Sequence, residues 1–232
     1  MYLSYIYYYA EKTALRIGVK VLIELVKIDI MLDITYQGVY KMILFVNACV
    51  RPESRTYILA KHVLDQMDGE IQQVNLAEEK ISPLDWEAIQ KRDEYTRSGD
   101  FSDPIFKYAL QFVQADEIVI AAPYWDLMFP AIVRIYLEAV TISGLSFKYD
   151  EDGNARGLCK AKRVIYVTTS GGPVAQYNLG YDYIKALCRV FYGIPEIVCY
   201  SAENLDIVGA DVEGIINKAK EQIFEDFTIK HP

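Results

Sequence analysis

The sequence predicts an α/β fold, a doubly wound five-stranded parallel sheet with helices on both faces. From Met42 onward, short apolar segments alternate with longer segments whose apolar residues recur at helical spacing. The segments that read as strands are near-continuous apolar runs joined to the helices by short returns, as in parallel sheets covered on both faces. With right-handed crossovers, the simplest strand order for five such strands is 2-1-3-4-5.

The expected elements follow one another regularly along the chain. Strands are expected at 42–48, 70–76, 117–122, 163–169 and 195–201. Helices are expected at about 54–67, 103–115, 129–143, 176–191 and 210–227.

Two stretches exceed this minimal unit. Residues 77–102 are charged and are expected to hold a short helix over 85–95. Residues 144–160 are expected to hold a short extended piece with a turn at Asp152-Gly153. Such additions at the ligand end of a sheet often become lids or subunit contacts.

The first 41 residues differ from the rest of the chain, being rich in Tyr, Ile and Leu. Charges at Lys20, Glu24 and Lys27 interrupt the apolar run that a membrane span would need, and no secretory signal is evident. We therefore expect residues 1–41 to be a leader or extension outside the fold, and 42–232 to be the folded domain. The alternative is an amphipathic helix over 14–34 that contacts a membrane surface or a partner.

Composition narrows the classes of function. A hydrophobic content of 52% supports a sizeable core, and a net charge of −8 argues against a broad nucleic-acid surface. The four cysteines form no framework typical of secreted proteins, and Cys188 and Cys199 are expected to be buried small hydrophobes. With only His62 and His231, neither a Cys–His nucleophile nor a multi-histidine zinc site fits. We expect a cytoplasmic protein with no bound metal, no nucleic-acid partner and no membrane contact.

The first strand ends in a loop suited to a phosphate. Residues 42–56 read MILFVNACVRPESRT, so an apolar run stops at a polar loop that opens a helix with hydroxyls at Ser54 and Thr56. Free N–H groups and the positive end of the macrodipole make a helix start a binding place for anions. Glycine is absent, so neither GxGxxG nor GxxxxGK[ST] fits. An ordinary capped helix is the alternative, because Ser and Thr are common caps.

Two further strands end in loops with ligand-binding chemistry. EIVIAAP runs into YWDLMFP at 124–130, and RVIYVTT runs into SGGPV at 170–174. Ligands of open parallel sheets bind outside the carboxyl ends of the strands, where the strand order reverses. We therefore expect the three loops to share one site.

From Met42 to about Thr228 the chain resembles the FMN-dependent NAD(P)H:quinone oxidoreductase and azoreductase family of flavodoxin-like proteins. The segments that carry the resemblance are NACVRPESRT, APYWDLMFPAIVRIYLEAVTISGLSFKYDEDGNARGL and TTSGGPV. The middle segment is the most specific. It matches a proline, an aromatic-rich loop, a second proline that starts a helix, and an F-[RK]-Y element before a glycine-containing turn.

The resemblance implies that all three loops bind FMN. The phosphate would lie at Ser54, Arg55 and Thr56, with Cys49 near it or near the ribityl chain; the isoalloxazine would lie against Pro123, Tyr124, Trp125, Asp126 and Leu127; and its pyrimidine edge would lie at Thr169, Ser170, Gly171 and Gly172. Where many relatives carry an arginine before the glycine pair, this chain has Ser170, which supplies no charge there. Plainer alternatives are that the two aromatics are core residues, that the glycines form a plain turn, and that Asp126 caps the following helix.

The resemblance also implies an enzyme that transfers electrons from NADH or NADPH to quinones or azo compounds. Transfer would be two-electron and ping-pong through flavin N5, so no catalytic side chain is required. Phe147 and Tyr149 would reach the substrate pocket, often across a homodimer interface; the alternative is that they pack a β extension. The helix over 129–143 is apolar around most of its circumference, which favours a second partner surface; the alternative is that residues 144–160 fold back over this helix within one chain.

Two other functions stay open on the residues alone. One is a flavodoxin-like electron carrier, which binds FMN but oxidises no nicotinamide, and the insertions at 77–102 and 144–160 argue against it because they would wall a substrate pocket. The other is a non-enzymatic flavin-binding or regulatory protein on the same fold.

Overall fold

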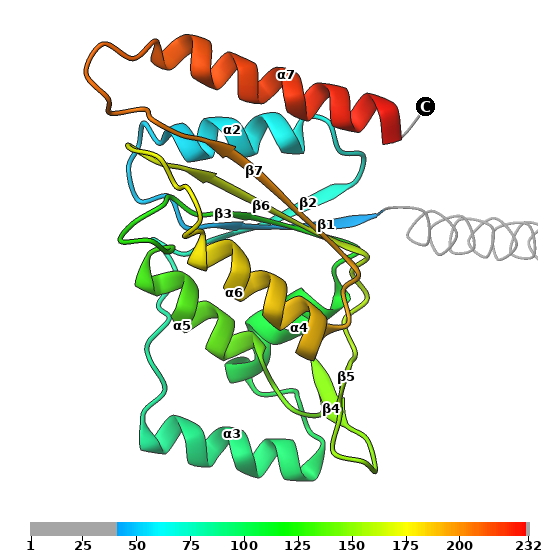
Figure 1. Cartoon of the computed structure of the whole chain (residues 1–232). Coiled ribbons are helices and arrows are strands. Elements are labelled where there is room, and N and C mark those ends of the chain that lie inside the picture. The colour runs from blue at the N-terminus through cyan, green and yellow to red at the C-terminus, as the bar shows by residue number, and fades with distance from the viewer. Residues whose placement is uncertain (1–40, 231–232) are drawn as a thin grey trace, which may run out of the picture. The chain divides into compact units, whose positions relative to one another are not determined.

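A five-stranded parallel sheet forms the middle layer of residues 41–230, the part of the chain that the computed structural model describes (Figure 1). Its strands are β1 (Met42–Asn47), β2 (Glu70–Asn75), β3 (Glu117–Ala121), β6 (Arg163–Thr169) and β7 (Glu196–Ala202). Their order is β2-β1-β3-β6-β7. This is the predicted order 2-1-3-4-5, so the fold class is confirmed. The predicted extension over 1–41 lies, apart from Lys41, outside the described residues.

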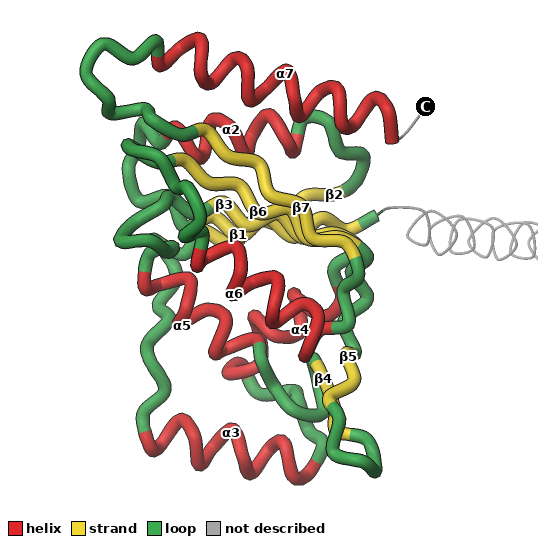
Figure 2. The backbone as a smooth tube through the Cα atoms, viewed as in Figure 1, coloured by secondary structure: helices red, strands yellow, loops and turns green. Residues whose placement is uncertain are grey.

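Helices cover both faces of this sheet, as Figure 2 shows. One face carries α2 (Arg55–Leu64) and α7 (Val212–Lys230). The other face carries α4 (Lys107–Gln114), α5 (Ala131–Val140) and α6 (Leu179–Leu187). In residues 41–230 we find no helix with both the length and the apolar character to span a bilayer.

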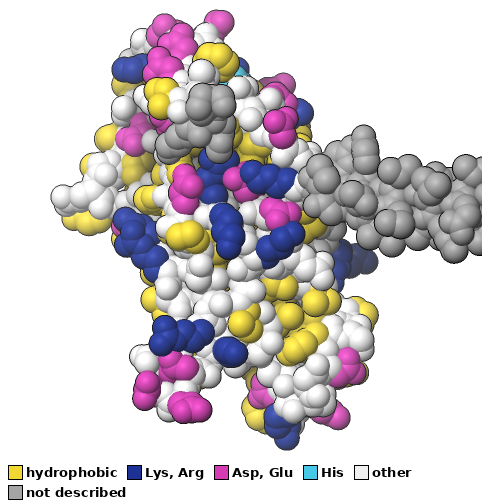
Figure 3. All heavy atoms as spheres, turned by 90° about the vertical axis from the view of Figure 1, so that its right-hand side faces the viewer, with side chains coloured by type: hydrophobic (Ala, Val, Ile, Leu, Met, Phe, Trp, Pro, Cys, Tyr) yellow, Lys and Arg dark blue, Asp and Glu magenta, His cyan; other side chains and the backbone are white. Residues whose placement is uncertain are grey.

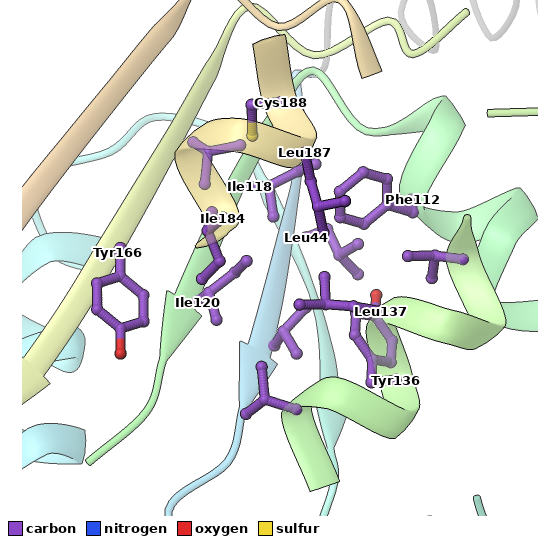
Figure 4. Packing of buried hydrophobic residues seen from close by; sticks show 14 of the residues in the cluster. Leu44, Phe112, Ile118, Ile120, Tyr136, Leu137, Tyr166, Ile184, Leu187 and Cys188 are labelled. Atoms are coloured by element: carbon purple, nitrogen blue, oxygen red, sulfur yellow. The ribbon is translucent and has the colours of Figure 1, made fainter. Parts of the chain in front are cut away.

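Alternate side chains of the central strands enter two separate cores. Leu44, Ile118 and Tyr166 belong to the core beneath α4, α5 and α6 (Figure 4), whereas Ile43 and Phe45 belong to the core beneath α2 and α7. Burial on both faces explains the near-continuous apolar sequences of β1, β3 and β6. The edge strand β2 departs from that expectation, because only one of its residues is buried.

Several predicted helices are interrupted or shortened. The helix expected over 103–115 is a short 3-10 turn, η1 (Pro104–Phe106), followed by α4. The helix expected over 176–191 begins only after Asn178, whose side chain accepts the N–H of Tyr181. It closes in a π-helical turn, η2 (Cys188–Tyr192).

The two insertions take the forms that the sequence predicts in outline. Residues 77–102 contain α3 (Trp86–Ser98), which lies beyond the helical layer and has no buried side chain. Residues 144–160 form an antiparallel hairpin of β4 (Phe147–Tyr149) and β5 (Ala155–Gly157). The hairpin packs so closely on η2 that a Cβ at Gly157 would lie 2.2 Å from the carbonyl carbon of Tyr192.

A buried ion network ties the sheet at its amino edge. Glu117 and Arg163 face each other in the register of β3 and β6, and each side chain is only 8% exposed. Arg163 Nη2 lies 2.9 Å from Glu117 Oε1, and Lys41 Nζ lies 2.9 Å from Glu117 Oε2. The Arg163 guanidinium also lies over the ring of Phe227 in α7, 5.0 Å from its centroid. Figure 3 shows basic and acidic side chains interspersed on this side of the molecule.

Replacing Arg163 with Met should lower the free energy of unfolding by about 2–4 kcal/mol, because Glu117 would stay buried with only the half-exposed Lys41 as partner. The double variant Arg163→Met/Glu117→Gln should recover most of that loss, since no uncompensated charge remains buried. Urea denaturation measures both. Equal losses in the two variants would instead assign the effect to lost packing on Phe227.

Candidate functional site

A pocket of about 700 Å³ opens at the carboxyl edge of the sheet, within the size range of small-molecule sites. It is lined by four loops: Cys49, Val50, Arg51, Pro52, Glu53, Ser54, Arg55 and Thr56 after β1; Pro123, Tyr124 and Trp125 after β3; Thr169, Ser170 and Gly171 after β6; and Leu205 and Asp206 after β7. The three loops predicted from the sequence therefore line one pocket, and the loop after β7 lines it as well.

The start of α2 forms the polar end of this pocket. Ser54 is its N-cap, and Ser54 Oγ accepts the N–H of Tyr57 at 3.2 Å. The N–H groups of Arg55 and Thr56 find no acceptor among the residues that the structure describes. Free N–H donors at the positive end of a helix, beside an arginine, form an anion site.

The Thr56 hydroxyl is engaged inside the protein. Thr56 Oγ1 lies 2.6 Å from Thr169 Oγ1, and both side chains are buried. This bridge joins the first helix to the end of β6. The backbone N–H groups of Arg55 and Thr56 are therefore the freer donors at this end of the pocket, together with the remaining hydrogen-bonding capacity of the hydroxyls.

A two-residue turn of unusual sequence follows β3. Trp125 N donates to Met128 O at 2.7 Å and Met128 N donates to Trp125 O at 2.8 Å, so only Asp126 and Leu127 form the turn. Both have positive φ, at 51° and 69°. Such two-residue turns favour Asn-Gly, and this chain holds a bulky residue in the left-handed region instead.

The turn holds its aromatic residues at the pocket. Trp125 is 41% exposed and lines the pocket with Tyr124, so neither is a core residue. Tyr124 N donates to Thr169 O at 3.0 Å, which joins this loop to the one after β6. The alternative role for Asp126 as a helix cap is wrong, because the N-cap of α5 is Pro130 and no side chain caps it.

The loop after β6 lies close to the loop after β7 at Gly171. A Cβ at Gly171 would lie 2.3 Å from Asp206 Oδ2, so a larger residue there would displace the exposed Asp206 side chain from this position. Ser170 is 4% exposed, and its hydroxyl donates to Gly172 O. This position therefore contributes a closed polar turn where the resembling family often has an arginine.

Cys49 contributes a neutral thiol to the pocket wall. Its N–H donates to Asn47 Oδ1 at 3.0 Å, and burial raises the pKa of its thiol. A thiol in this state is a poor nucleophile at neutral pH. Within residues 41–230 no group of three or more His, Cys, Asp or Glu side chains is placed to hold a metal ion.

Some predicted site residues lie outside the pocket wall. Asp126, Leu127 and Gly172 only neighbour the lining residues in the chain. Phe147 and Tyr149 belong to the β4–β5 hairpin, where Phe147 is buried against Phe191 with ring centroids 4.7 Å apart. Tyr149 is 58% exposed. Within one chain, the structure does not bring this hairpin to the pocket.

The fourth loop, which contributes Leu205 and Asp206, is not among the loops predicted from the sequence. A signal was present, because the strand predicted at 195–201 is also followed by a polar segment, AENLD, before the last helix. In a parallel sheet that segment must emerge at the same edge as the other three.

Comparisons with known proteins agree on the fold and on the family. The model of a protein family described as flavodoxin-like matches residues 41–226. The FMN-dependent NADH:quinone oxidoreductase 2 of Clostridium acetobutylicum is 38% identical over 200 residues, covering 79% of this chain and 98% of that protein. The FMN-dependent NADH:quinone oxidoreductase of Lachnoclostridium phytofermentans is 34% identical over 192 residues, covering 78% and 94%.

Solved structures show the same fold. An azoreductase from Bacillus anthracis superposes with a TM-score of 0.70 at 22% identity, covering 81% of this chain and 98% of that one. An FMN-dependent NADH-azoreductase from Bacillus anthracis in complex with FMN gives a TM-score of 0.67 at 20% identity, covering 83% and 100%.

Replacing Asp126-Leu127 with Asn-Gly should raise the free energy of unfolding by about 1–2 kcal/mol, because glycine removes the cost of the left-handed backbone. Leu127→Ala is the matched control, since it removes the same side chain but keeps a Cβ at positive φ. Thermal or urea unfolding distinguishes them. If both variants are equally stable, the turn is not strained.

Proposed function

The chain belongs to the flavodoxin-like family and, within it, to the FMN-dependent NADH:quinone oxidoreductases, and we propose that the pocket at the carboxyl edge of its sheet is the FMN site. The protein is accordingly an oxidoreductase with FMN as cofactor, NADH as electron donor and a quinone as acceptor. Its relatives are named as enzymes, which does not support the alternatives of an electron carrier or a non-enzymatic flavin-binding protein.

The main support for the proposed site is that one pocket contains both an anion-binding helix start and a wall of half-exposed aromatic side chains. The unpaired N–H groups of Arg55 and Thr56 and the Arg55 guanidinium suit a phosphate dianion. The flat faces of Tyr124 and Trp125 line the same pocket and suit a tricyclic ring. The residues present therefore fit FMN, although the chain itself is acidic.

Bound FMN would supply the chemistry of hydride transfer from the nicotinamide to the acceptor, at flavin N5. This chain's residues would bind and orient. The start of α2 would fix the phosphate, the tight turn at 126–127 would hold Trp125 against the ring, and the neutral Cys49 would form part of the pocket wall. No lining side chain needs to act as an acid or base.

Azo compounds are proposed as further acceptors, because structural neighbours of the same fold are azoreductases. A pocket open to solvent beside an aromatic wall can admit flat substrates of either kind. We also propose a cytoplasmic location, with which four free cysteines agree.

We further propose that the enzyme is a homodimer whose partner chain completes the substrate pocket. Tyr149 is exposed on a hairpin that packs on η2 of its own chain. Beside the lining residue Tyr124, whose hydroxyl donates to Tyr177 O at 2.9 Å, lie three large apolar side chains that are each at least 45% exposed: Leu127, Tyr177 and Leu179. Two-fold symmetry would let the hairpin of one chain cover the mouth in the other.

The purified protein should show flavin absorption that bleaches anaerobically with NADH and returns when a quinone is added. These successive additions test the cofactor, the electron donor and the acceptor in one experiment. Absence of flavin after reconstitution with FMN would contradict the site. Bound flavin that NADH cannot bleach would favour the electron carrier.

Tyr149→Ala should raise the KM for the quinone by about 3- to 10-fold, the loss typical of one aromatic contact, and change the Kd for FMN much less. Phe224→Ala is the control, because it removes an equally exposed aromatic from α7. Light scattering should give twice the chain mass. A stable monomer with full quinone reductase activity would refute the shared pocket.

A further inference from the structure

The loop that follows β7 brings a carboxylate to the phosphate end of the pocket. Asp206 lines the pocket together with Arg55, and Arg55 Nη1 lies 2.7 Å from Asp206 Oδ1. The same guanidinium nitrogen donates to Leu205 O at 3.2 Å. Two acceptors on one loop thus fix the direction of the Arg55 side chain.

The position of Asp206 is set independently of Arg55. Asp206 N donates to Gly171 O at 2.9 Å, and Leu205 N donates to Ser170 O at 3.1 Å. The carboxylate lies directly over Gly171, in space that a side chain at that position would contest. Asp206 is therefore held by the loop after β6 and can serve as a fixed support for Arg55.

This ion pair is not explained by folding stability. The two side chains are 41% and 70% exposed, and exposed pairs contribute little to stability. A carboxylate beside a phosphate site would by itself repel the ligand. The arrangement is useful only if the carboxylate acts through the arginine that it orients.

We propose that Asp206 is a positioning residue that holds the Arg55 guanidinium at the phosphate-binding start of α2. The inference rests on the proposed FMN site and assigns a role to the fourth loop within it. Without the Asp206 carboxylate, only the Leu205 carbonyl would hold the guanidinium, which would then sample more rotamers and lose part of its contact with the phosphate.

The proposal predicts that the effect of Asp206→Asn on FMN affinity changes sign when Arg55 is removed. With Arg55 present, Asp206→Asn should weaken FMN binding by about 3- to 10-fold, the size expected for two coupled side chains. In the Arg55→Ala background, the same Asp206→Asn change should tighten FMN binding, because it removes an unpaired negative charge next to the phosphate.

The experiment titrates FMN and, separately, riboflavin into the full-length apoprotein of the wild type, both single variants and the double variant. Riboflavin lacks the phosphate, so its affinity should change little in every variant. Glu221→Gln, on the exposed surface of α7, controls for the change in net charge. Thermal unfolding of each apoprotein checks that the fold is intact.

Each remaining outcome overturns the proposal. If Asp206→Asn weakened the binding of FMN and riboflavin equally, Asp206 would serve only to shape the pocket. If it tightened FMN binding with Arg55 present, Asp206 would only repel the phosphate. Additive effects in the cycle would show that the two residues act independently. If the wild type binds FMN in these cases, the proposed function stands; if it binds neither flavin, the FMN site itself is refuted.

Discussion

Parallel pairing of β1, β3, β6 and β7 brings the ends of four strands to one edge of the sheet, and the whole candidate site depends on this direction. The pairing continues past the strands as a series of backbone hydrogen bonds. Ala122 N donates to Val167 O, Tyr124 N to Thr169 O, and Ser170 N to Ala202 O. The loops are therefore extensions of the sheet, and the packed core that holds the sheet rigid also holds the pocket.

Much of this arrangement could be predicted because apolar strands and polar loops differ in sequence. Residues 163–169 have the predicted bounds, and the hydroxyls at Ser54 and Thr56 marked a helix start that the structure confirms. Hydrophobic periodicity carries this information directly.

What could not be predicted depends on backbone conformation and on long-range contacts. Asp126 and Leu127 adopt positive φ without the glycine that would signal it. The interruption of the helix over 103–115 is likewise set by local turn geometry. The approach of Asp206 to Gly171 joins loops that are distant in sequence, so no local pattern reports it.

The pocket is assembled from segments far apart in the chain: the Thr56–Thr169 bridge spans 113 residues and the Arg55–Asp206 pair spans 151. No fragment that lacks either the start of α2 or the loop after β7 can form it, so a ligand bound there stabilises only the native arrangement of the whole sheet. The lifetime of this protein in a cell would then follow the supply of flavin, because chains that lack the cofactor open more often and are degraded sooner.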